Sequence, residues 1–175
     1  MKKTTKPEVV ISSAEFPDDR FVIMNLFTAY ADSLEIDLTF QNFSHELSSL
    51  PGKYTPDNGG VLLIARVISV DSSSEVSTAQ EPIGCVALRP FSPPHTCELK
   101  RLYIVPEVRG LGAGRKLLEA VLERAKTMGY KEMVLDTLPS MVPARKMYKA
   151  FGFEEVEKYY DNPIEGTSFM RLKLD

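Results

Sequence analysis

The sequence predicts a mixed α/β (α+β) fold, in which a mostly antiparallel central sheet of about seven strands is flanked by about four helices. Three observations support this prediction. Short apolar or β-branched runs of strand length recur along the chain, other segments repeat apolar residues at helical spacing, and the two kinds do not alternate strictly. The expected order β, α, α, β, β, β, α, β, α, β, β differs from the regular alternation of a doubly wound nucleotide-binding fold.

The first half of the chain supplies a strand, two helices and a second strand. Pro17-Asp18-Asp19 offers a helix start before a run of apolar residues at helical spacing, and Pro51-Gly52 ends the shorter second helix. The expected elements are a strand at 9–11, helices at 21–34 and 40–50, and a strand at 61–70.

Residues 71–81 are almost wholly polar, so they lack apolar surface to bury and are expected to form an exposed hairpin loop. Residues 1–7 are expected to form a flexible N-terminus. No internal repeat interrupts the chain, and residues 1–175 are interpreted as a single domain.

The second half alternates strands with two amphipathic helices. Gly129 and Gly152 are suited to close these helices, and Ser140 is the expected cap of the second one. The expected elements are strands at 83–88 and 97–105, a helix from Leu111, a strand at 133–135, a helix from Ser140, and a strand at 169–174.

Composition narrows the functional classes. The net charge of -3 argues against a nucleic-acid-binding protein, and no apolar stretch is long enough to span a membrane. Cys85 and Cys97 lie in strand-like runs without metal-ligand spacing, so no metal is expected and both thiols are interpreted as inert core residues. These features favour a reducing, cytoplasmic location.

The most informative segment is the loop Arg109-Gly110-Leu111-Gly112-Ala113-Gly114, which follows an apolar strand and opens a helix. Small residues let backbone N–H groups approach an anion at the helix N-terminus, and Arg109, Arg115 and Lys116 add local positive charge. The dinucleotide spacing fails because Arg115 occupies its third glycine position, and no Gly-Lys precedes Ser or Thr as a P-loop requires. The alternative is that the glycines only permit a tight turn.

The loop resembles the signature [Arg/Gln]-x-x-Gly-x-[Gly/Ala] of the GNAT superfamily of N-acetyltransferases. A second element of that family, Ala-x-x-x-Tyr-x-x-x-Gly-Phe, is similar to the segment from Ala144 through Tyr148 to Phe153. The resemblance covers nearly the whole chain and implies acetyl-CoA as co-substrate. It also implies that the strand before the loop diverges from its neighbour.

The resemblance further implies the roles of individual residues. Main-chain groups of Leu102 and Ile104 would pair with the pantetheine arm, and the Leu102 N–H would polarise the thioester carbonyl. Tyr148 would protonate the departing thiolate, whereas a half-buried core tyrosine is the structural alternative. Met141 occupies a position where the family often has Asn, so a hydrogen bond to cofactor or substrate is in doubt.

Glu98 is the candidate general base, because a partly desolvated carboxylate on a strand can accept the proton of the attacking ammonium. It lies eleven residues before Arg109, the offset of the basic glutamate in histone-acetylating members of the family. A solvated glutamate beside Lys100 or Arg101 is the alternative. The consecutive polar residues Lys100 and Arg101 also break the alternation of the strand, which a β-bulge would explain.

The leading hypothesis is an N-acetyltransferase that moves an acetyl group from acetyl-CoA to a primary amine by direct attack in a ternary complex. The alternative is a non-catalytic acyl-CoA-binding or sensing domain. A small-molecule amine and a protein lysine both remain open as acceptor, and a homodimer is possible. The loop Tyr159-Tyr160-Asp161-Asn162-Pro163 is either a wall of the acceptor site or a turn with packed rings.

Overall fold

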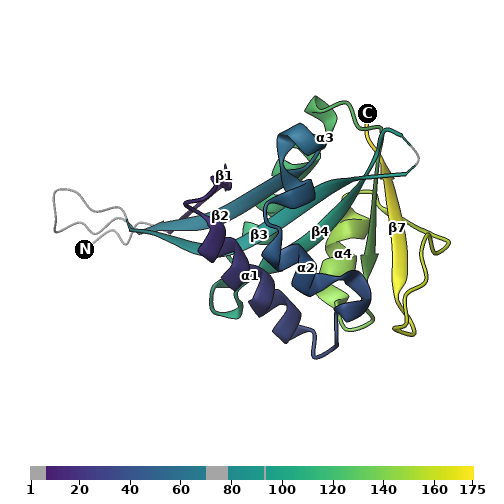
Figure 1. Cartoon of the computed structure of the whole chain (residues 1–175), viewed down its shortest axis with the longest axis horizontal. Helices are drawn as coiled ribbons and strands as arrows, with labels where there is room; N and C mark the ends of the chain where they lie inside the picture. Colours follow the sequence, from purple (N-terminus) through teal and green to yellow (C-terminus); the bar gives the residue numbers. More distant parts are fainter. Residues whose placement is uncertain (1–6, 70–78, 93) are drawn as a thin grey trace.

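A computed structural model describes residues 7–69, 79–92 and 94–175. Within them, seven strands form one sheet in the order β1-β2-β3-β4-β5-β7-β6 (Figure 1). The strands are β1 (Glu8–Ser13), β2 (Val61–Ser69), β3 (Ala79–Phe91), β4 (Thr96–Ile104), β5 (Glu132–Thr137), β6 (Glu154–Val156) and β7 (Ser168–Lys173). Among the strands of the described residues, only β4 and β5 pair in parallel, so the predicted mostly antiparallel sheet is confirmed.

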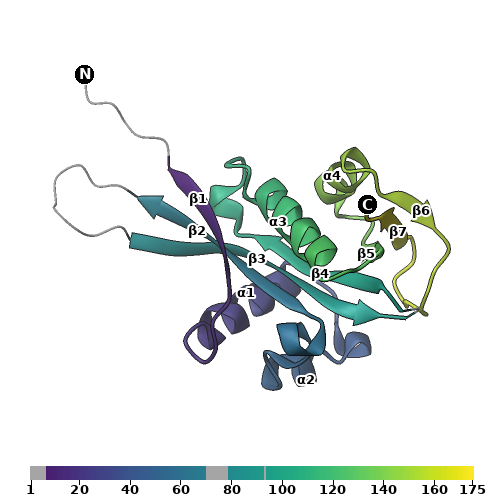
Figure 2. The same ribbon diagram turned by 90° about the horizontal axis from the view of Figure 1, so that it is seen from above.

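Four α-helices cover the two faces of this sheet, as predicted: α1 (Arg20–Ser33), α2 (Phe43–Ser48), α3 (Ala113–Thr127) and α4 (Val142–Ala150). Figure 2 shows α3 and α4 on one face and α1 and α2 on the other. Each face has its own apolar core. Leu117, Leu118 and Val121 of α3 are fully buried in the first core, and Ile23 and Phe27 of α1 in the second.

Most expected elements are confirmed, but several boundaries are wrong. Residues 79–81 belong to β3 and not to the exposed loop, because backbone pairing with β2 continues to Ser69↔Ala79 although the side chains are polar. The rest of that predicted loop within 70–78, and the predicted flexible residues 1–6, lie outside the described residues. Among the described residues, no helix is long and apolar enough to cross a bilayer.

Two helix starts also differ from the prediction. The helix expected at 40–50 is divided into a 3₁₀ turn at Thr39–Gln41 and α2, because Asn42 takes a left-handed conformation with φ 56°. Helix α4 is preceded by Met141 and not by Ser140, and neither the Met141 side chain nor any other caps it. Pro143 lies in its first turn, where a missing N–H is tolerated.

The sheet contains a built-in gap where the parallel strands part. Register pairing of β4 with β5 covers only residues Thr96, Cys97 and Glu98, although β4 continues to Ile104 and β5 to Thr137. This is the divergence that the family resemblance implies. The predicted bulge is also present, because the β3–β4 register shifts between Cys85 and Ala87 and Arg101 has φ 57°.

Candidate active site

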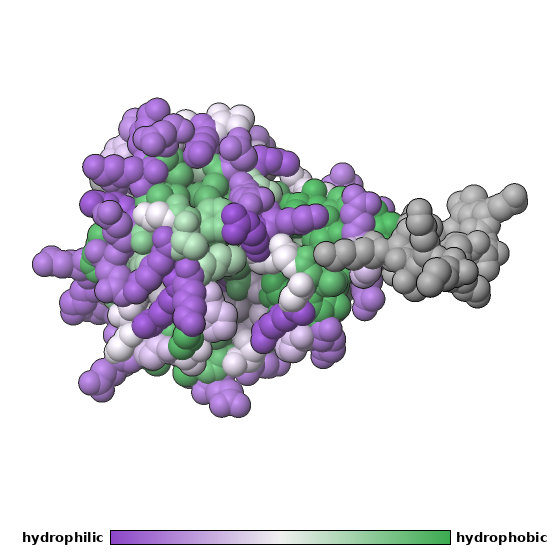
Figure 3. Space-filling view, turned by 180° about the vertical axis from the view of Figure 1, so that it is seen from behind, coloured by the Kyte–Doolittle hydropathy of each residue, from purple (hydrophilic) through white to green (hydrophobic). Residues whose placement is uncertain are grey.

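A cleft of about 800 Å³ follows the gap between β4 and β5 and continues to the loop before α3. Its walls come from the C-terminal end of α1, from β4 and β5, and from the first turns of α3 and α4. Following β4 toward its C-terminus, the lining residues include Lys100, Arg101, Leu102, Ile104, Arg109 and Gly110. Figure 3 shows the face opposite to that of Figure 1, where apolar residues reach the surface among mostly hydrophilic ones.

The loop before α3 presents backbone donors to this cleft. Gly110 and Gly112 have φ values of +97° and +78°, and a Cβ added at either would meet nothing within 4 Å. The N–H of Lys116 makes the first intrahelical bond, to the Gly112 carbonyl at 3.1 Å. The preceding N–H groups at the positive end of the helix dipole therefore have no intrahelical acceptor, which suits them to an anionic phosphate.

The other residues of the predicted loop do not all face the cleft. Ala113, Gly114 and Arg115 line the cleft, whereas the Leu111 side chain packs against the core beneath α3. Arg109 donates from Nε to the Ile104 carbonyl at 3.2 Å, and this hydrogen bond fixes the Arg109 side chain next to the end of β4.

The two other cations of this region face different surroundings. Arg115 is exposed and pairs with Glu119 at 3.1 Å. The expectation that Lys116 adds charge at the loop is wrong, because its ammonium donates to the Val9 carbonyl of β1 at 3.2 Å. The local positive charge at the loop therefore comes from Arg109 and Arg115.

The middle of the cleft is lined by Leu102 and Ile104 of β4 and by Tyr148 of α4. Arg101 and Leu102 lie opposite the register shift, so neither has a register partner on β3, and pairing with β5 has already ended at Glu98. The Leu102 backbone is thus outside the regular ladder on both sides, within the described strands. Such a position leaves a backbone N–H free for a ligand.

Tyr148 combines a packed ring with a hydroxyl at the cleft. The ring lies edge-on to Phe153 with centroids 5.6 Å apart, and the hydroxyl has no hydrogen-bond partner among the described residues. Burial raises the pKa of Tyr148 above its usual value, and the nearby Tyr30 and Asp136 raise it further. The hydroxyl therefore keeps its proton at ordinary pH, as a proton donor must.

Glu98 is buried at the point where β4 and β5 part, with 1% of its surface exposed, so it is not a solvated glutamate. One carboxylate oxygen accepts from Arg89, its direct cross-strand partner, with Nη2 at 2.7 Å. The other accepts from the Tyr159 hydroxyl at 2.9 Å. Glu98 is not among the residues that line the cleft.

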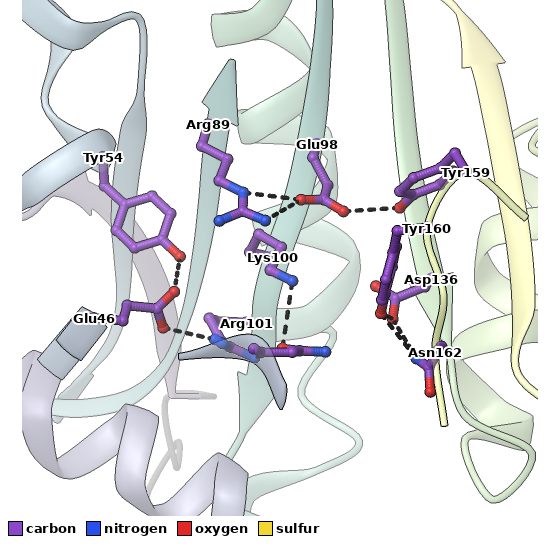
Figure 4. A network of polar contacts seen from close by, with 11 residues as sticks. Glu46, Tyr54, Arg89, Glu98, Lys100, Arg101, Asp136, Tyr159, Tyr160 and Asn162 are labelled. Atoms are coloured by element: carbon purple, nitrogen blue, oxygen red, sulfur yellow. Dashed lines mark hydrogen bonds and ion pairs between the residues drawn. The ribbon is translucent and has the colours of Figure 1, made fainter. Parts of the chain in front are cut away.

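Asp136 of β5 also lines the cleft, and it was not among the predicted site residues. It accepts hydrogen bonds from the Tyr160 hydroxyl and from Asn162 Nδ2, the latter at 3.3 Å (Figure 4). Tyr159 and Tyr160 are therefore packed rings that support carboxylates at the edge of the cleft and do not line it themselves. The sequence offered one signal, because Asp136 is an acidic residue directly after the apolar run Met133–Leu135.

The two cysteines are buried on opposite faces of the sheet. Burial raises the pKa of the Cys97 thiol to about 12 and that of the Cys85 thiol further still. Neither residue lines the cleft. Because a thiolate is the reactive form, neither thiol is suited to carry a covalent intermediate.

Comparison with known proteins agrees with this geometry. The sequence matches the Acetyltransferase (GNAT) family over residues 39–153. It is 41% identical over 166 residues to an uncharacterized N-acetyltransferase of Schizosaccharomyces pombe, with 95% of each chain covered.

Two solved structures share the fold. A GNAT-family acetyltransferase of Staphylococcus aureus superposes with a TM-score of 0.74 at 18% identity, covering 96% of this chain and 100% of that one. The Salmonella typhimurium protein yncA, solved with its cofactor acetyl-CoA, gives a TM-score of 0.66 at 18% identity, covering 95% of this chain and 94% of that one. Together with the family match and the S. pombe relative, they show that the chain belongs to the GNAT family and is an acetyl-CoA-dependent N-acetyltransferase.

Proposed function

We propose that the chain transfers an acetyl group from acetyl-CoA to a primary amine by direct attack, with both substrates bound at once. The observation that carries this proposal is the continuity of the cleft, which extends from the glycine loop at α3 to charged residues on the opposite face of the sheet. A continuous cleft of this kind allows the two substrates to meet at the gap between β4 and β5. Membership in a family of acetyltransferases weighs against the non-catalytic acyl-CoA sensor.

The chain's own residues fit the cofactor. In the proposal, the loop from Arg109 to Arg115 holds the pyrophosphate, because its glycine cradle is open and its helix N-terminus has free donors. The main-chain groups of Leu102 and Ile104 hold the pantetheine arm beside the bulge. Acetyl-CoA supplies the activated thioester when bound.

Proton transfers are assigned to Tyr148 and Glu98. Tyr148 is the proposed donor to the departing sulfur, since it lines the cleft and its hydroxyl has no hydrogen-bond partner in the described part of the chain. Glu98 stays the proposed base because it stands where the strands part. Both of its oxygens already accept hydrogen bonds, so this assignment depends on the test of a Glu98 variant.

The first experiment compares melting temperatures with acetyl-CoA, NAD, ATP and no ligand. Acetyl-CoA at ~100 times its dissociation constant stabilises the fold by ~2.7 kcal/mol, which raises the melting temperature by about 5–10 °C for a domain of this size. NAD is expected to give no comparable shift. An amine screen by release of free CoA thiol follows. Acetyl-CoA that leaves the melting temperature unchanged would contradict the proposed cofactor site.

A further inference from the structure

The part of the cleft away from the glycine loop is called the acceptor half here. It contains two charged side chains that take part in no ion pair within the described residues, Lys100 on β4 and Asp136 on β5. Lys100 is only 5% exposed, and among the described residues its ammonium donates only to Gln41 Oε1, at 3.4 Å. Within the described part of the chain, Asp136 accepts side-chain hydrogen bonds only from the neutral groups of Tyr160 and Asn162. Figure 4 shows the ammonium and the carboxylate on the two sides of the gap.

The neighbouring charges are neutralised by the protein itself. Arg89 pairs with Glu98 at 2.7 Å, and Arg101 pairs with Glu46 at 2.8 Å. Lys100 is therefore the cation on this wall that has no direct ion-pair partner, and burial lowers its pKa although the charges of Glu98 and Asp136 act in the opposite direction. An ammonium that is removed from water without a carboxylate in direct contact is costly, which indicates that a ligand group completes this site.

Arg101 is a second buried cation of this strand, but its charge is balanced by Glu46. Its guanidinium is held against the rings of Tyr30 and Phe43, with its carbon 5.6 Å and 5.2 Å from their centroids. Its Nη2 is buried and has no hydrogen-bond partner among the described residues. Because that nitrogen is covered and the guanidinium is paired with Glu46, Arg101 is not available to a ligand, and Lys100 is the cation that remains for the contact.

We propose that the acetyl acceptor is an amine that also carries a carboxylate, of the amino-acid class, with its carboxylate on Lys100 and its ammonium on Asp136. This inference rests on the proposed function and names its substrate class. A dipolar molecule of this kind bridges the gap with opposite charges in contact at both ends. A polyamine would place a further cation beside Lys100 and Arg101, and a simple monoamine would leave Lys100 unpaired.

The test measures thiol release from acetyl-CoA with each of the twenty amino acids, with the matching amino-acid amides, and with the matching decarboxylated amines. We expect kcat/KM for the best amino acid to exceed that of its amide and of its amine by about 10-fold or more, since a charge-assisted contact is lost. Amides or simple amines that react as well as the amino acids would overturn the inference while leaving the proposed function standing. If none of the amino acids, amides or amines gives thiol release above the background without an amine, both the inference and the proposed function are contradicted.

Variants locate the carboxylate contact. Lys100→Met should bring the ratio of kcat/KM between amino acid and amide close to one, and Lys100→Arg should restore part of it. This ratio is insensitive to a partly unfolded preparation because both substrates share one sample. Arg66→Met is the matched control, since Arg66 is a partly buried cation of the same sheet that pairs with Asp19 at 2.7 Å and does not line the cleft. A wild-type ratio in Lys100→Met would contradict the inference.

Discussion

Substitution of Gly112 by glutamate separates a cofactor loop from a merely structural turn. Gly112 has φ +78°, so any side chain there is strained by roughly 1–2 kcal/mol. A Cβ would meet no atom within 4 Å, so no clash adds to this strain. The new carboxylate also lies at the N-terminus of α3, where the helix dipole favours it. We therefore expect Gly112→Glu to fold.

Binding of acetyl-CoA should respond very differently. The carboxylate would occupy the open space beside the free N–H groups of α3, where the pyrophosphate is proposed to lie. Two unit charges of the same sign about 4 Å apart repel by ~4 kcal/mol at an effective dielectric constant of ~20, which corresponds to a roughly 1000-fold weaker Kd. Part of this repulsion is screened at physiological salt, so the loss should shrink as salt is added.

The assay is isothermal titration with acetyl-CoA, supported by melting curves without ligand. Gly129→Glu is the matched control, because Gly129 closes the same helix with φ +87° and equally open space but lies far from the loop in sequence. Gly112→Gln measures bulk without charge. Equal acetyl-CoA affinity in Gly112→Glu and Gly129→Glu would refute the assignment of the pyrophosphate to this loop.

Three further predictions concern buried or half-buried hydroxyl and carboxyl groups. Tyr148→Phe should lower kcat by 10-fold or more with little change in KM for acetyl-CoA, as about 10²–10⁴-fold is typical of general acid–base catalysis; an unchanged kcat would remove Tyr148 as the acid. Glu98→Gln should cost about 3 kcal/mol in urea unfolding, because Arg89 loses its partner. If its rate and pH profile both match the wild type, Glu98 is not the base. Burial raises the pKa of Tyr159 above ~10, so the folded state keeps a proton that the unfolded chain releases, and stability should fall as pH rises above ~10. Tyr159→Phe should flatten that fall in alkaline urea titrations, and an unchanged slope would argue against it.

Local patterns were enough to predict most elements of the fold. Apolar periodicity located α3 and its buried face, and the glycine loop before it was identified from residue types alone. The break at Asn42, with φ 56°, was missed because Asn, although enriched in the left-handed conformation, also occurs inside helices, so its presence alone does not mark a break. The start of β3 was missed because backbone pairing, which is independent of side-chain polarity, extends the hairpin.

The site was predictable only where it is local in sequence. Glu98 could be identified as unusual, but its burial depends on Arg89, which becomes its direct partner only through the β3–β4 register. Asp136 and Lys100 are far apart along the chain, and they face the same gap because β4 and β5 part after Glu98. Which charges remain unpaired is a property of the assembled sheet.

One irregularity of the backbone connects the two halves of the cleft. In a regular strand, Lys100 and Arg101 would point to opposite faces of the sheet. The bulge at Arg101, with φ 57°, interrupts that alternation, so both cations reach the face covered by α1 and α2. The same bulge removes Leu102 from the ladder with β3. A change that straightened β4 would therefore disturb the proposed thioester contact and the acceptor site together, which gives the fold a physical reason to keep a strained residue here.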